Sequence, residues 1–227
     1  MNQSPKLKIK SQNYKNNKKI SVFDLDRTLL SVNSSFTYYF YLRKKRIFPF
    51  FSFFVCLGFL LQYYLFNLSP EKLHWKIFNK FLKGRKKKEI FSYVNEFFVL
   101  YLSKCFYLPA VKALKKAKKE GQFIYLLSNS PEEIVKVIAK HLDVDAYKAT
   151  QYKIDKDDNM RDIHFLMGGS EKAKFIQNLK QKDKKIIYAF SDSIWDLPLF
   201  STADYKIAVN PDRKLKKIAK KNLWQVI

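Results

Sequence analysis

The second half of the chain alternates short apolar runs with amphipathic helical patterns, and this alternation restricts the folds that the chain can adopt. Helices are predicted over residues 109–120, 131–142, 171–181, 194–200 and 212–221, and strands over 123–127, 146–152, 186–190 and 205–209, with a hairpin through 155–159. Strands separated by helices form mostly parallel sheets that are covered on both faces. The sequence therefore predicts an α/β fold with a Rossmann-like, mostly parallel sheet.

One more strand lies far upstream of this region. Residues 20–23 are apolar and stop abruptly at Asp24, as expected for a buried strand that ends at a polar edge. Between residues 31 and 108 only helical patterns occur, including one over 71–82 and another from beyond Gly84 to about residue 102. We therefore expect a core made of residues 20–30 and 109–227, with residues 31–108 inserted as a helical cap.

Polar side chains follow the predicted strands at the points where the strands end. They are Asp24 and Asp26 after the first strand, Ser128 and Asn129 after the second, and Ser191, Asp192 and Asp196 after a later one, while Lys172 begins an intervening helix. In open α/β sheets ligands bind beyond the carboxyl ends of the strands, so these side chains are expected to face one crevice. Each alone also fits a turn residue, a helix cap or a solvated lysine. Together, carboxylates, a lysine and a hydroxyl suit a hard cation and a phosphoryl group.

Four segments in this order resemble the motifs of the haloacid dehalogenase superfamily of aspartate-nucleophile phosphatases. They are Phe23-Asp24-Leu25-Asp26-Arg27-Thr28-Leu29, Leu127-Ser128-Asn129, Gly169-Ser170-Glu171-Lys172 and Ser191-Asp192-Ser193-Ile194-Trp195-Asp196-Leu197. The inserted cap and the ending over residues 203–211 resemble the subfamily that includes phosphoserine phosphatases. Two positions depart from the common pattern, because Arg27 and Ser191 stand where glycine is usual. Neither departure removes a catalytic group.

The resemblance implies a chemical role for each of these residues. Asp24 would attack phosphorus to form an aspartyl-phosphate, and Asp26 would protonate the leaving alkoxide and then deprotonate the hydrolytic water. Mg²⁺ would be held by Asp24, Asp192 and the main-chain carbonyl of Asp26. The other expected roles are a second positive charge from Lys172, binding of the substrate phosphoryl group by Ser128 and Asn129, and orientation of Lys172 or a metal-bound water by Asp196.

Positive charge is concentrated in two segments. The chain carries 44 Lys and Arg against 20 Asp and Glu, a net charge of +24, and residues 1–19 together with 31–108 supply +16 of it. Residues 1–19 contain six lysines, no acid and no apolar run typical of a secretory signal, so we expect a basic flexible tail. The surplus charge suits an anionic membrane surface, or it covers solvated faces of a lysine-rich chain. Nucleic acid is a poorer partner, because the interleaved aromatic and lysine residues fit cap helices at least as well.

Cysteine usage excludes two further classes of protein. Cys56 and Cys105 are the only cysteines, and they lie in no zinc-binding pattern. A disulfide framework and a zinc site are therefore excluded, and a reducing compartment is expected.

The cap contains a long uncharged segment. Residues 47–70 are 24 residues without charge, and the apolar part, 47–68, is long enough for a membrane helix. A single crossing would separate Asp24 from Lys172 and Asp192, which must meet in one site. The segment is therefore predicted to lie at or re-enter the membrane interface, with basic residues 43–46 beside anionic headgroups, or to be buried in the cap. We favour membrane contact, because a cap of this size has little interior.

The cap also bears on the substrate. Its apolar segment and the Ser191-Asp192-Ser193 sequence resemble, more loosely, the phosphatidylglycerophosphatase C family, and no Asp or Glu between Arg27 and Pro70 could hold the ammonium of phosphoserine. The first hypothesis is a cytoplasmic Mg²⁺-dependent phosphatase, peripheral or re-entrant at the inner face of the membrane, that acts on a lipid phosphate such as phosphatidylglycerophosphate. The second is a soluble small-metabolite phosphatase of the phosphoserine phosphatase type. A third, a basic binding module on a decayed hydrolase fold, is disfavoured because the expected catalytic and metal residues are intact.

Overall fold

The computed structural model describes residues 8–9, 17–182 and 184–227. In this part of the chain, eight strands form one sheet in the order β1-β4-β3-β2-β6-β7-β8, with β5 paired to β4. The strands are β1 Lys8–Ile9, β2 Lys19–Phe23, β3 Phe123–Pro131, β4 Ala146–Ile154, β5 Met160–Phe165, β6 Ile186–Ser191, β7 Tyr205–Ala208 and β8 Gln225–Val226. All neighbours from β4 to β8 in this order pair in parallel, whereas β1 and β5 pair antiparallel with β4. The predicted mostly parallel sheet is confirmed.

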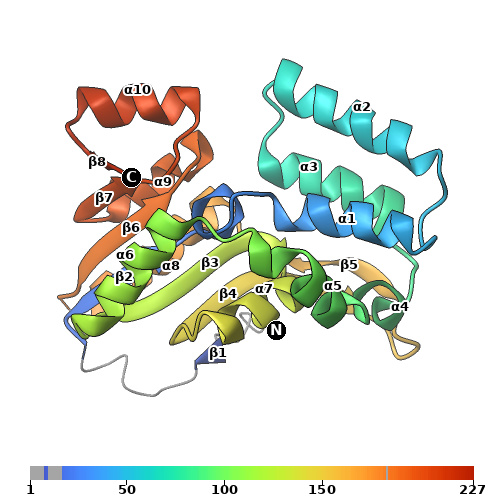
Figure 1. Ribbon diagram of the computed structural model, residues 1–227, viewed down its shortest axis with the longest axis horizontal. Helices are drawn as coiled ribbons and strands as arrows, with labels where there is room; N and C mark the ends of the chain where they lie inside the picture. The colour runs from blue at the N-terminus through green and yellow to red at the C-terminus, as the bar shows by residue number, and fades with distance from the viewer. Residues whose placement is uncertain (1–7, 10–16, 183) are drawn as a thin grey trace.

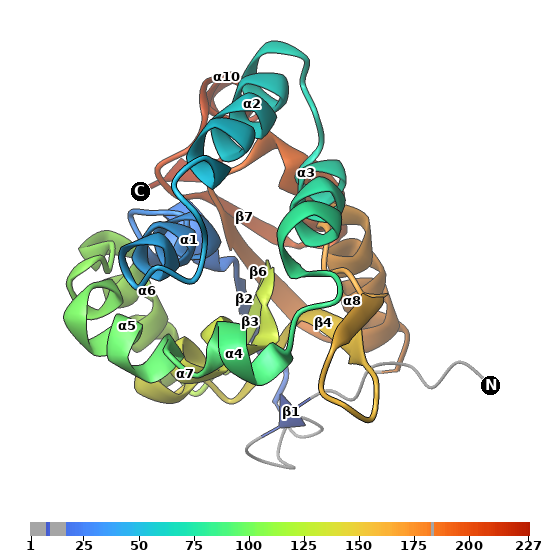
Figure 2. The same cartoon turned by 90° about the vertical axis from the view of Figure 1, so that its right-hand side faces the viewer.

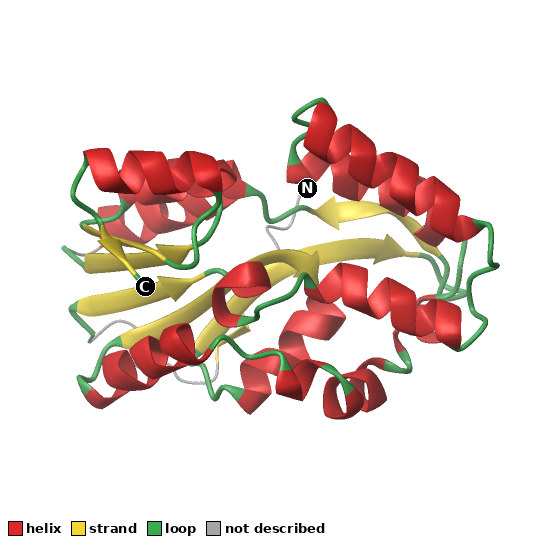
Figure 3. Cartoon of the chain, turned by 45° about the horizontal axis from the view of Figure 1, so that its top comes forward, coloured by secondary structure: helices red, strands yellow, loops and turns green. Residues whose placement is uncertain are grey.

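Alternate residues of the central strands face opposite sides of the sheet, which gives two apolar layers. Phe23 and Leu126 share one apolar cluster with residues of α6 (Leu108–Lys119) and α7 (Glu132–His141). Val22 and Tyr125 share the other with residues of α8 (Gly169–Lys182), α9 (Leu197–Thr202) and α10 (Arg213–Lys221). Figure 3 shows the strands running between these two groups of helices. The expected covering of both sheet faces is therefore present.

The cap is inserted between two segments that run side by side. Ser31 N–H donates to the carbonyl of Cys105 at 2.8 Å, and Tyr107 N–H donates to the carbonyl of Leu29 at 2.9 Å. The cap helices are α1 Ser34–Lys44, α2 Ser52–Leu65, α3 Pro70–Ile77, α4 Lys87–Phe91 and α5 Val94–Leu100, with short helical turns at Phe78–Leu82 and Leu102–Lys104. Figure 1 shows α1, α2 and α3 on one side of the sheet end, with α4 and α5 on the other, near α7.

The cap helices are less regular than the sequence pattern predicts. The helix expected over 71–82 begins after Ser69, whose hydroxyl accepts from the N–H of Lys72 at 3.3 Å. It is α-helical to Ile77 and continues without a break as a π-helix to Leu82. The wider turn over Phe78–Leu82 directs three apolar side chains into the core at once. The expected helix to residue 102 is two helices, α4 and α5. Packing against the core, which a helical repeat does not encode, sets both boundaries.

Two short edge strands are not visible in the sequence pattern. Lys8–Ile9 lies within the expected flexible tail but pairs with Tyr147 and Ala146 of β4, so that part of the tail prediction is wrong. The rest of the tail up to residue 16 lies outside the described residues. At the other edge, Gln225–Val226 pairs with β7. Strands of two residues contain too little apolar alternation to be predicted.

The uncharged segment of the cap contains α2, a helix of 14 residues. Ser52 and Cys56 on its inner side are buried, whereas its outer side is exposed. Burial of the uncharged segment in the cap, one of the two predicted arrangements, is therefore found for the inner side of α2 and not for its outer side. Among the helices of the described residues, none combines the length and the apolar character that a membrane crossing requires.

Candidate active site

Lys172 lies between two carboxylates that come from opposite ends of the core sequence. Its Nζ atom is 2.6 Å from Asp24 Oδ1 and 2.9 Å from Asp196 Oδ2, and all three side chains are buried. The hydroxyl of Ser191 donates to the same oxygen of Asp196 at 2.6 Å. Burial opposes the charged ammonium, but the charges of Asp196 and Asp24 outweigh it and hold the pKa of Lys172 above its usual value. The cation therefore has a fixed position at the end of β2.

Thr28 connects Asp24 with Asp192. Its Oγ1 atom is 3.3 Å from Asp24 Oδ2 and 3.2 Å from Asp192 Oδ1, and it accepts the N–H of Asp192 at 3.1 Å. A hydroxyl has one proton, so it can donate fully to only one of the two carboxylates. Thr28 belongs to the first motif, but its type and position predict no role for it. The available signal was the alternation of Asp24, Asp26 and Thr28 directly after a strand.

The two carboxylates beside Thr28 suit a divalent cation. Burial, with the charges of Asp196 and Asp26, raises the pKa of Asp24 to about 7, although Lys172 acts in the opposite direction. Burial and the charges of Asp24 and Asp196 likewise raise the pKa of Asp192 well above its usual range. A cation between Asp24 and Asp192 would remove this repulsion, and oxygen ligands are those that Mg²⁺ prefers.

The side chains of Asp24 and Asp192, both within hydrogen-bond distance of Thr28, are the candidate ligands of this cation. Within the described ranges, no cluster of three or more His, Cys, Asp or Glu side chains could hold a metal ion. The expected site needs only Asp24 and Asp192 as carboxylate ligands, because Asp26 was assigned through its main-chain carbonyl. The donor set therefore fits a cation that keeps several waters, as Mg²⁺ does.

The carboxylate of Asp26 is held by residues near the start of the cap and the end of β3. Its Oδ1 accepts the N–H of Ser34 at 2.6 Å, and its Oδ2 accepts the hydroxyl of Ser130 at 2.5 Å. Ser130 Oγ is also 2.7 Å from Ser35 Oγ. Burial raises the pKa of Asp26, while the hydrogen bonds from Ser130 and Ser34 oppose the rise. None of the three serines was singled out from the sequence, where they lie in no recognisable pattern.

Arg27 and Ser191, the two residues that stand where glycine is usual in the motifs, each have a structural explanation. Arg27 has φ of 61°, a left-handed conformation that explains why glycine is usual there. Asp26, just before it, has extended angles of φ −73° and ψ 127°. The second departure, Ser191, supplies the hydroxyl bound to Asp196.

Ser128 and Asn129 lie near the carboxyl end of β3, where they hydrogen-bond to Ser130 and Thr150. Ser128 is buried, and its hydroxyl oxygen accepts the N–H of Ser130 at 3.1 Å. The backbone carbonyl of Asn129 accepts the hydroxyl of Thr150 at 2.8 Å. Their binding to a phosphoryl group stays a prediction.

Glycine at the start of α8 allows Lys172 to reach Asp196. A Cβ atom on Gly169 would lie 2.1 Å from the carbonyl oxygen of Trp195, next to Asp196 in the chain. The N–H of Gly169 donates to Glu71 Oε1 of the cap at 3.2 Å. Glu71 lies directly after the acid-free stretch of the cap, and no sequence pattern connects it with Gly169.

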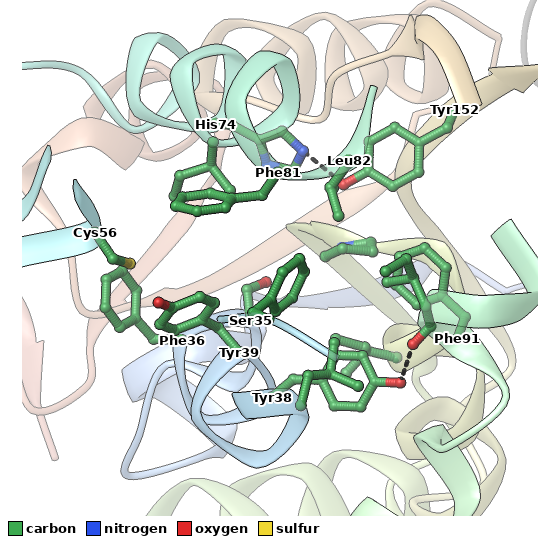
Figure 4. Close-up of a pocket in the computed structure, with 16 residues that line it drawn as sticks. Ser35, Phe36, Tyr38, Tyr39, Cys56, His74, Phe81, Leu82, Phe91 and Tyr152 are labelled. Carbon is green, nitrogen blue, oxygen red and sulfur yellow. Dashed lines mark hydrogen bonds between the residues drawn. The ribbon is translucent and has the colours of Figure 1, made fainter. Parts of the chain in front are cut away.

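An apolar cavity of about 90 Å³ lies between the cap and the core. Its lining contains no charged side chain and consists of Ser35, Phe36, Tyr38, Tyr39, Leu42, Phe48, Cys56, His74, Ile77, Phe81, Leu82, Ile90, Phe91, Pro131, Ile134 and Tyr152. Figure 4 shows the aromatic rings around it and the hydrogen bond of 2.9 Å between His74 Nε2 and the Tyr152 hydroxyl. Burial lowers the pKa of His74 to about 4, which favours the neutral ring. Ser35 connects the cavity wall to Asp26 through Ser130.

The sequence is similar to a protein family and to several curated proteins. A model of the haloacid dehalogenase-like hydrolases matches residues 21–201. A probable phosphatase of Mycobacterium tuberculosis is 30% identical over 142 residues, covering 61% of this chain and 50% of that protein. A phosphoserine phosphatase of the same organism is 23% identical over 150 residues, covering 64% of this chain and 49% of that protein. The chain thus spans about half the length of the curated relatives that it matches.

Two solved structures share the fold. A Bordetella pertussis protein of unknown function has a TM-score of 0.80 at 22% identity, covering 93% of this chain and 98% of that one. A substrate-bound phosphoserine phosphatase has a TM-score of 0.66 at 17% identity, covering 93% and 92%. The agreement extends over nearly the whole chain, cap included.

Proposed function

The chain belongs to the haloacid dehalogenase-like hydrolase family, and from this we propose that it is a phosphomonoester hydrolase with Asp24 as its nucleophile. The observation that carries the proposal is the buried Lys172, 2.6 Å from Asp24 and held by Asp196. A carboxylate attacks a phosphate dianion only if nearby positive charge offsets the repulsion. Lys172 provides such a charge at a fixed position.

The proposed reaction has two steps. In the first, a carboxylate oxygen of Asp24 bonds to phosphorus, the bond from phosphorus to the alcohol oxygen breaks, and Asp26 gives its proton to that oxygen. In the second, Asp26 takes a proton from water, the water oxygen bonds to phosphorus, and Asp24 is released together with inorganic phosphate. The raised pKa of Asp26 suits the acid role, and the donors Ser34 and Ser130 stabilise the carboxylate that remains.

We further propose that Mg²⁺ binds at Asp24 and Asp192, with the main-chain carbonyl of Asp26 as a third ligand. When bound, the ion supplies the positive charge that the two buried carboxylates lack and that the phosphoryl oxygens require. Thr28 keeps the two carboxylates together.

The proposed substrate is a lipid phosphate, such as phosphatidylglycerophosphate, at an anionic membrane surface on the cytoplasmic side. The leaving alcohol must approach Asp26 to be protonated, and Ser130 and Ser35 connect Asp26 to the apolar cavity. The lining of this cavity holds no carboxylate for an ammonium group. An uncharged alcohol therefore fits the approach better than an amino acid does.

A phosphoserine-type metabolite is the second candidate, and Glu71 is the observation that favours it. Its carboxylate reaches Gly169 at the start of the helix that carries Lys172. The ammonium group of such a substrate could pair with the Glu71 carboxylate, whereas residues 28–70 of the chain contain no Asp or Glu. The phosphoserine phosphatases among the structural neighbours are consistent with this alternative.

Steady-state kinetics on three substrates test the proposal: phosphatidylglycerophosphate in detergent micelles, phosphoserine and p-nitrophenyl phosphate. Asp24→Asn and excess EDTA should each abolish hydrolysis of all three. Asp26→Asn should lower kcat by about 10²-fold or more on the two alkyl phosphates. On p-nitrophenyl phosphate, whose leaving group needs no proton, it should spare the first step and slow only hydrolysis of the aspartyl-phosphate, so a burst of p-nitrophenol should precede slow turnover. Asp204→Asn, which changes a carboxylate at the amino end of β7, is the matched control and should retain activity.

Two results would reject the mechanism or its substrate. Turnover by Asp24→Asn, or turnover unchanged in EDTA, contradicts the mechanism. The lipid should exceed phosphoserine in kcat/KM by about 10²-fold or more. If phosphoserine equals the lipid, and Glu71→Gln lowers only phosphoserine hydrolysis, the metabolite assignment replaces the lipid.

A further inference from the structure

The outer side of α2 is apolar and uncovered. Five large side chains recur there every three or four residues and are between 40% and 69% exposed: Phe51, Phe54, Leu57, Leu61 and Leu65. Phe50 and Phe66 extend this stripe at its two ends. A contiguous exposed apolar surface of this kind marks an interaction site.

A second helix contributes a basic surface. Six of the nine residues of α10 are exposed cations: Arg213, Lys214, Lys216, Lys217, Lys220 and Lys221. Leu215 and Ala219 on its other side are buried against the core. The helix contains no acid, so its exposed side is uniformly positive.

The two helices lie on the same face of the molecule. Figures 1 and 2 show α2 and α10 together along one edge in perpendicular views. Lys214 Nζ donates to Asn67 Oδ1 at 2.8 Å, which joins α10 to the end of α2. At the start of α2, the Arg43 guanidinium lies 5.4 Å from the ring centre of Phe50. Positive charge therefore borders the apolar stripe at both ends.

We propose that this α2–α10 face, made of the apolar stripe and the α10 cations, docks on an anionic lipid bilayer. The stripe would enter the headgroup region while the α10 cations bind lipid phosphates. The proposal rests on the proposed function for its expectation of a lipid substrate, but docking itself requires no turnover. A second copy of the chain is a poorer occupant, because a two-fold contact would bring two sets of α10 cations together. An anionic surface neutralises them instead.

Both parts of the face connect directly to the candidate active site. Asp212, the N-cap of α10, donates its N–H to the carbonyl of Asp192 at 2.8 Å. On the other side, Glu71 follows the α2 to α3 connection and reaches Gly169. Docking through this face therefore holds the site close to the bilayer surface.

Vesicle flotation with the full chain tests the docking face. Vesicles of phosphatidylcholine, with and without about one third phosphatidylglycerol, are compared at about 0.05 M and about 0.5 M NaCl. The basic variant is Lys216→Gln/Lys217→Gln/Lys220→Gln, with Lys112→Gln/Lys115→Gln/Lys119→Gln of α6 as control. The apolar variant is Phe54→Ser/Leu57→Ser/Leu61→Ser, with Val99→Ser/Leu100→Ser/Leu108→Ser as control. All altered side chains are exposed, so folding should be preserved.

The wild type should float with anionic vesicles only. At low salt, the basic variant should bind anionic vesicles about 10-fold or more weakly than the wild type. At high salt, where some wild-type binding persists, the apolar variant should also bind about 10-fold or more weakly than the wild type. Both controls should stay close to the wild type. Far-ultraviolet circular dichroism and urea unfolding of each variant report an intact fold independently of any hydrolytic activity.

Three results would overturn the docking face. They are a wild type that ignores anionic vesicles, control variants that weaken binding as much as the test variants, and a wild-type dimer that the apolar variant dissociates. Vesicle binding by a chain that hydrolyses nothing would instead reject the proposed function and keep the docking face. The two proposals can therefore fail separately.

Discussion

Replacing Asp24 by asparagine should abolish turnover and yet make the metal-free protein more stable. Asp24, Asp192 and Asp196 are three buried carboxylates that share the one ammonium of Lys172. Without a divalent cation, the folded state therefore acquires an excess of buried negative charge as Asp24 loses its proton near pH 7. Asparagine has the shape of the protonated acid and removes one of these charges.

The size of the effect follows from the pKa of Asp24, which rises from its ordinary 3.8 to about 7 in the folded state. Between these values the folded state keeps a proton that the unfolded state has lost. The contribution of protonated Asp24 to the free energy of unfolding is therefore fully present below pH 3.8 and is lost as the pH rises through 7. At pH 8 the asparagine variant should therefore exceed the wild type by about 4 kcal/mol in the free energy of unfolding, and at pH 5 by less than about 2 kcal/mol.

Urea unfolding in EDTA, followed by circular dichroism at pH 5 and pH 8, measures this difference. The comparison must be between variants, because His74 titrates over part of the same range with the opposite sign. Asp204→Asn is the matched control: burial acts against the charged Asp204, but Lys180 outweighs it and lowers its pKa, so this change should destabilise. Added Mg²⁺ at about 100 times its dissociation constant should stabilise the wild type by about 2.7 kcal/mol and the variant by less. If Asp24→Asn lowers stability at pH 8 in EDTA, the excess of buried negative charge does not exist.

Three further outcomes are expected from single substitutions. Gly169→Ala should lower kcat and destabilise the folded protein by about 2 kcal/mol or more, because the new Cβ would meet the carbonyl of Trp195. The control Gly58→Ala meets nothing within 4 Å and should stabilise α2 by up to about 1 kcal/mol. Equal urea unfolding midpoints for the two variants would contradict this. The pKa of His74 is about 4 in the folded state, below its ordinary 6.5. Its contribution to the free energy of unfolding is therefore fully present above pH 6.5, and about 3 kcal/mol of it is lost as the pH falls through 4. His74→Gln should remove this loss in unfolding titrations, and an unchanged pH dependence would show that His74 is not buried in the neutral form. Ser191→Ala should destabilise by about 1 kcal/mol, measured by urea unfolding, because Asp196 loses a buried hydrogen bond; no change would mean that water replaces the hydroxyl.

The sheet and the core residues at its carboxyl edge could be predicted because they depend on local patterns. Apolar runs that end in Asp24 or Ser191 indicate both a strand and the edge where it stops. By contrast, Ser34 and Glu71 reach the candidate site through the placement of the cap, and Ser130 reaches Asp26 from the end of β3. All three contacts depend on packing between distant segments. No periodicity in the chain reports such contacts. Thr28 is intermediate, since its spacing from Asp24 was visible but its contact with Asp192 was not.

The contact between the two ends of the cap bears on the order in which the chain assembles. β2 and β3 pair in parallel, with Ile20 opposite Phe123, so the central pair joins positions 103 residues apart. Closing a loop of this length before other structure forms is entropically unfavourable and slow. If the cap helices collapse first, the pairing of Leu30 with Phe106 brings the two strands together across a much shorter effective loop. We therefore expect the inserted cap to fold before the central strands pair, and variants that weaken its packing to slow refolding of the whole sheet.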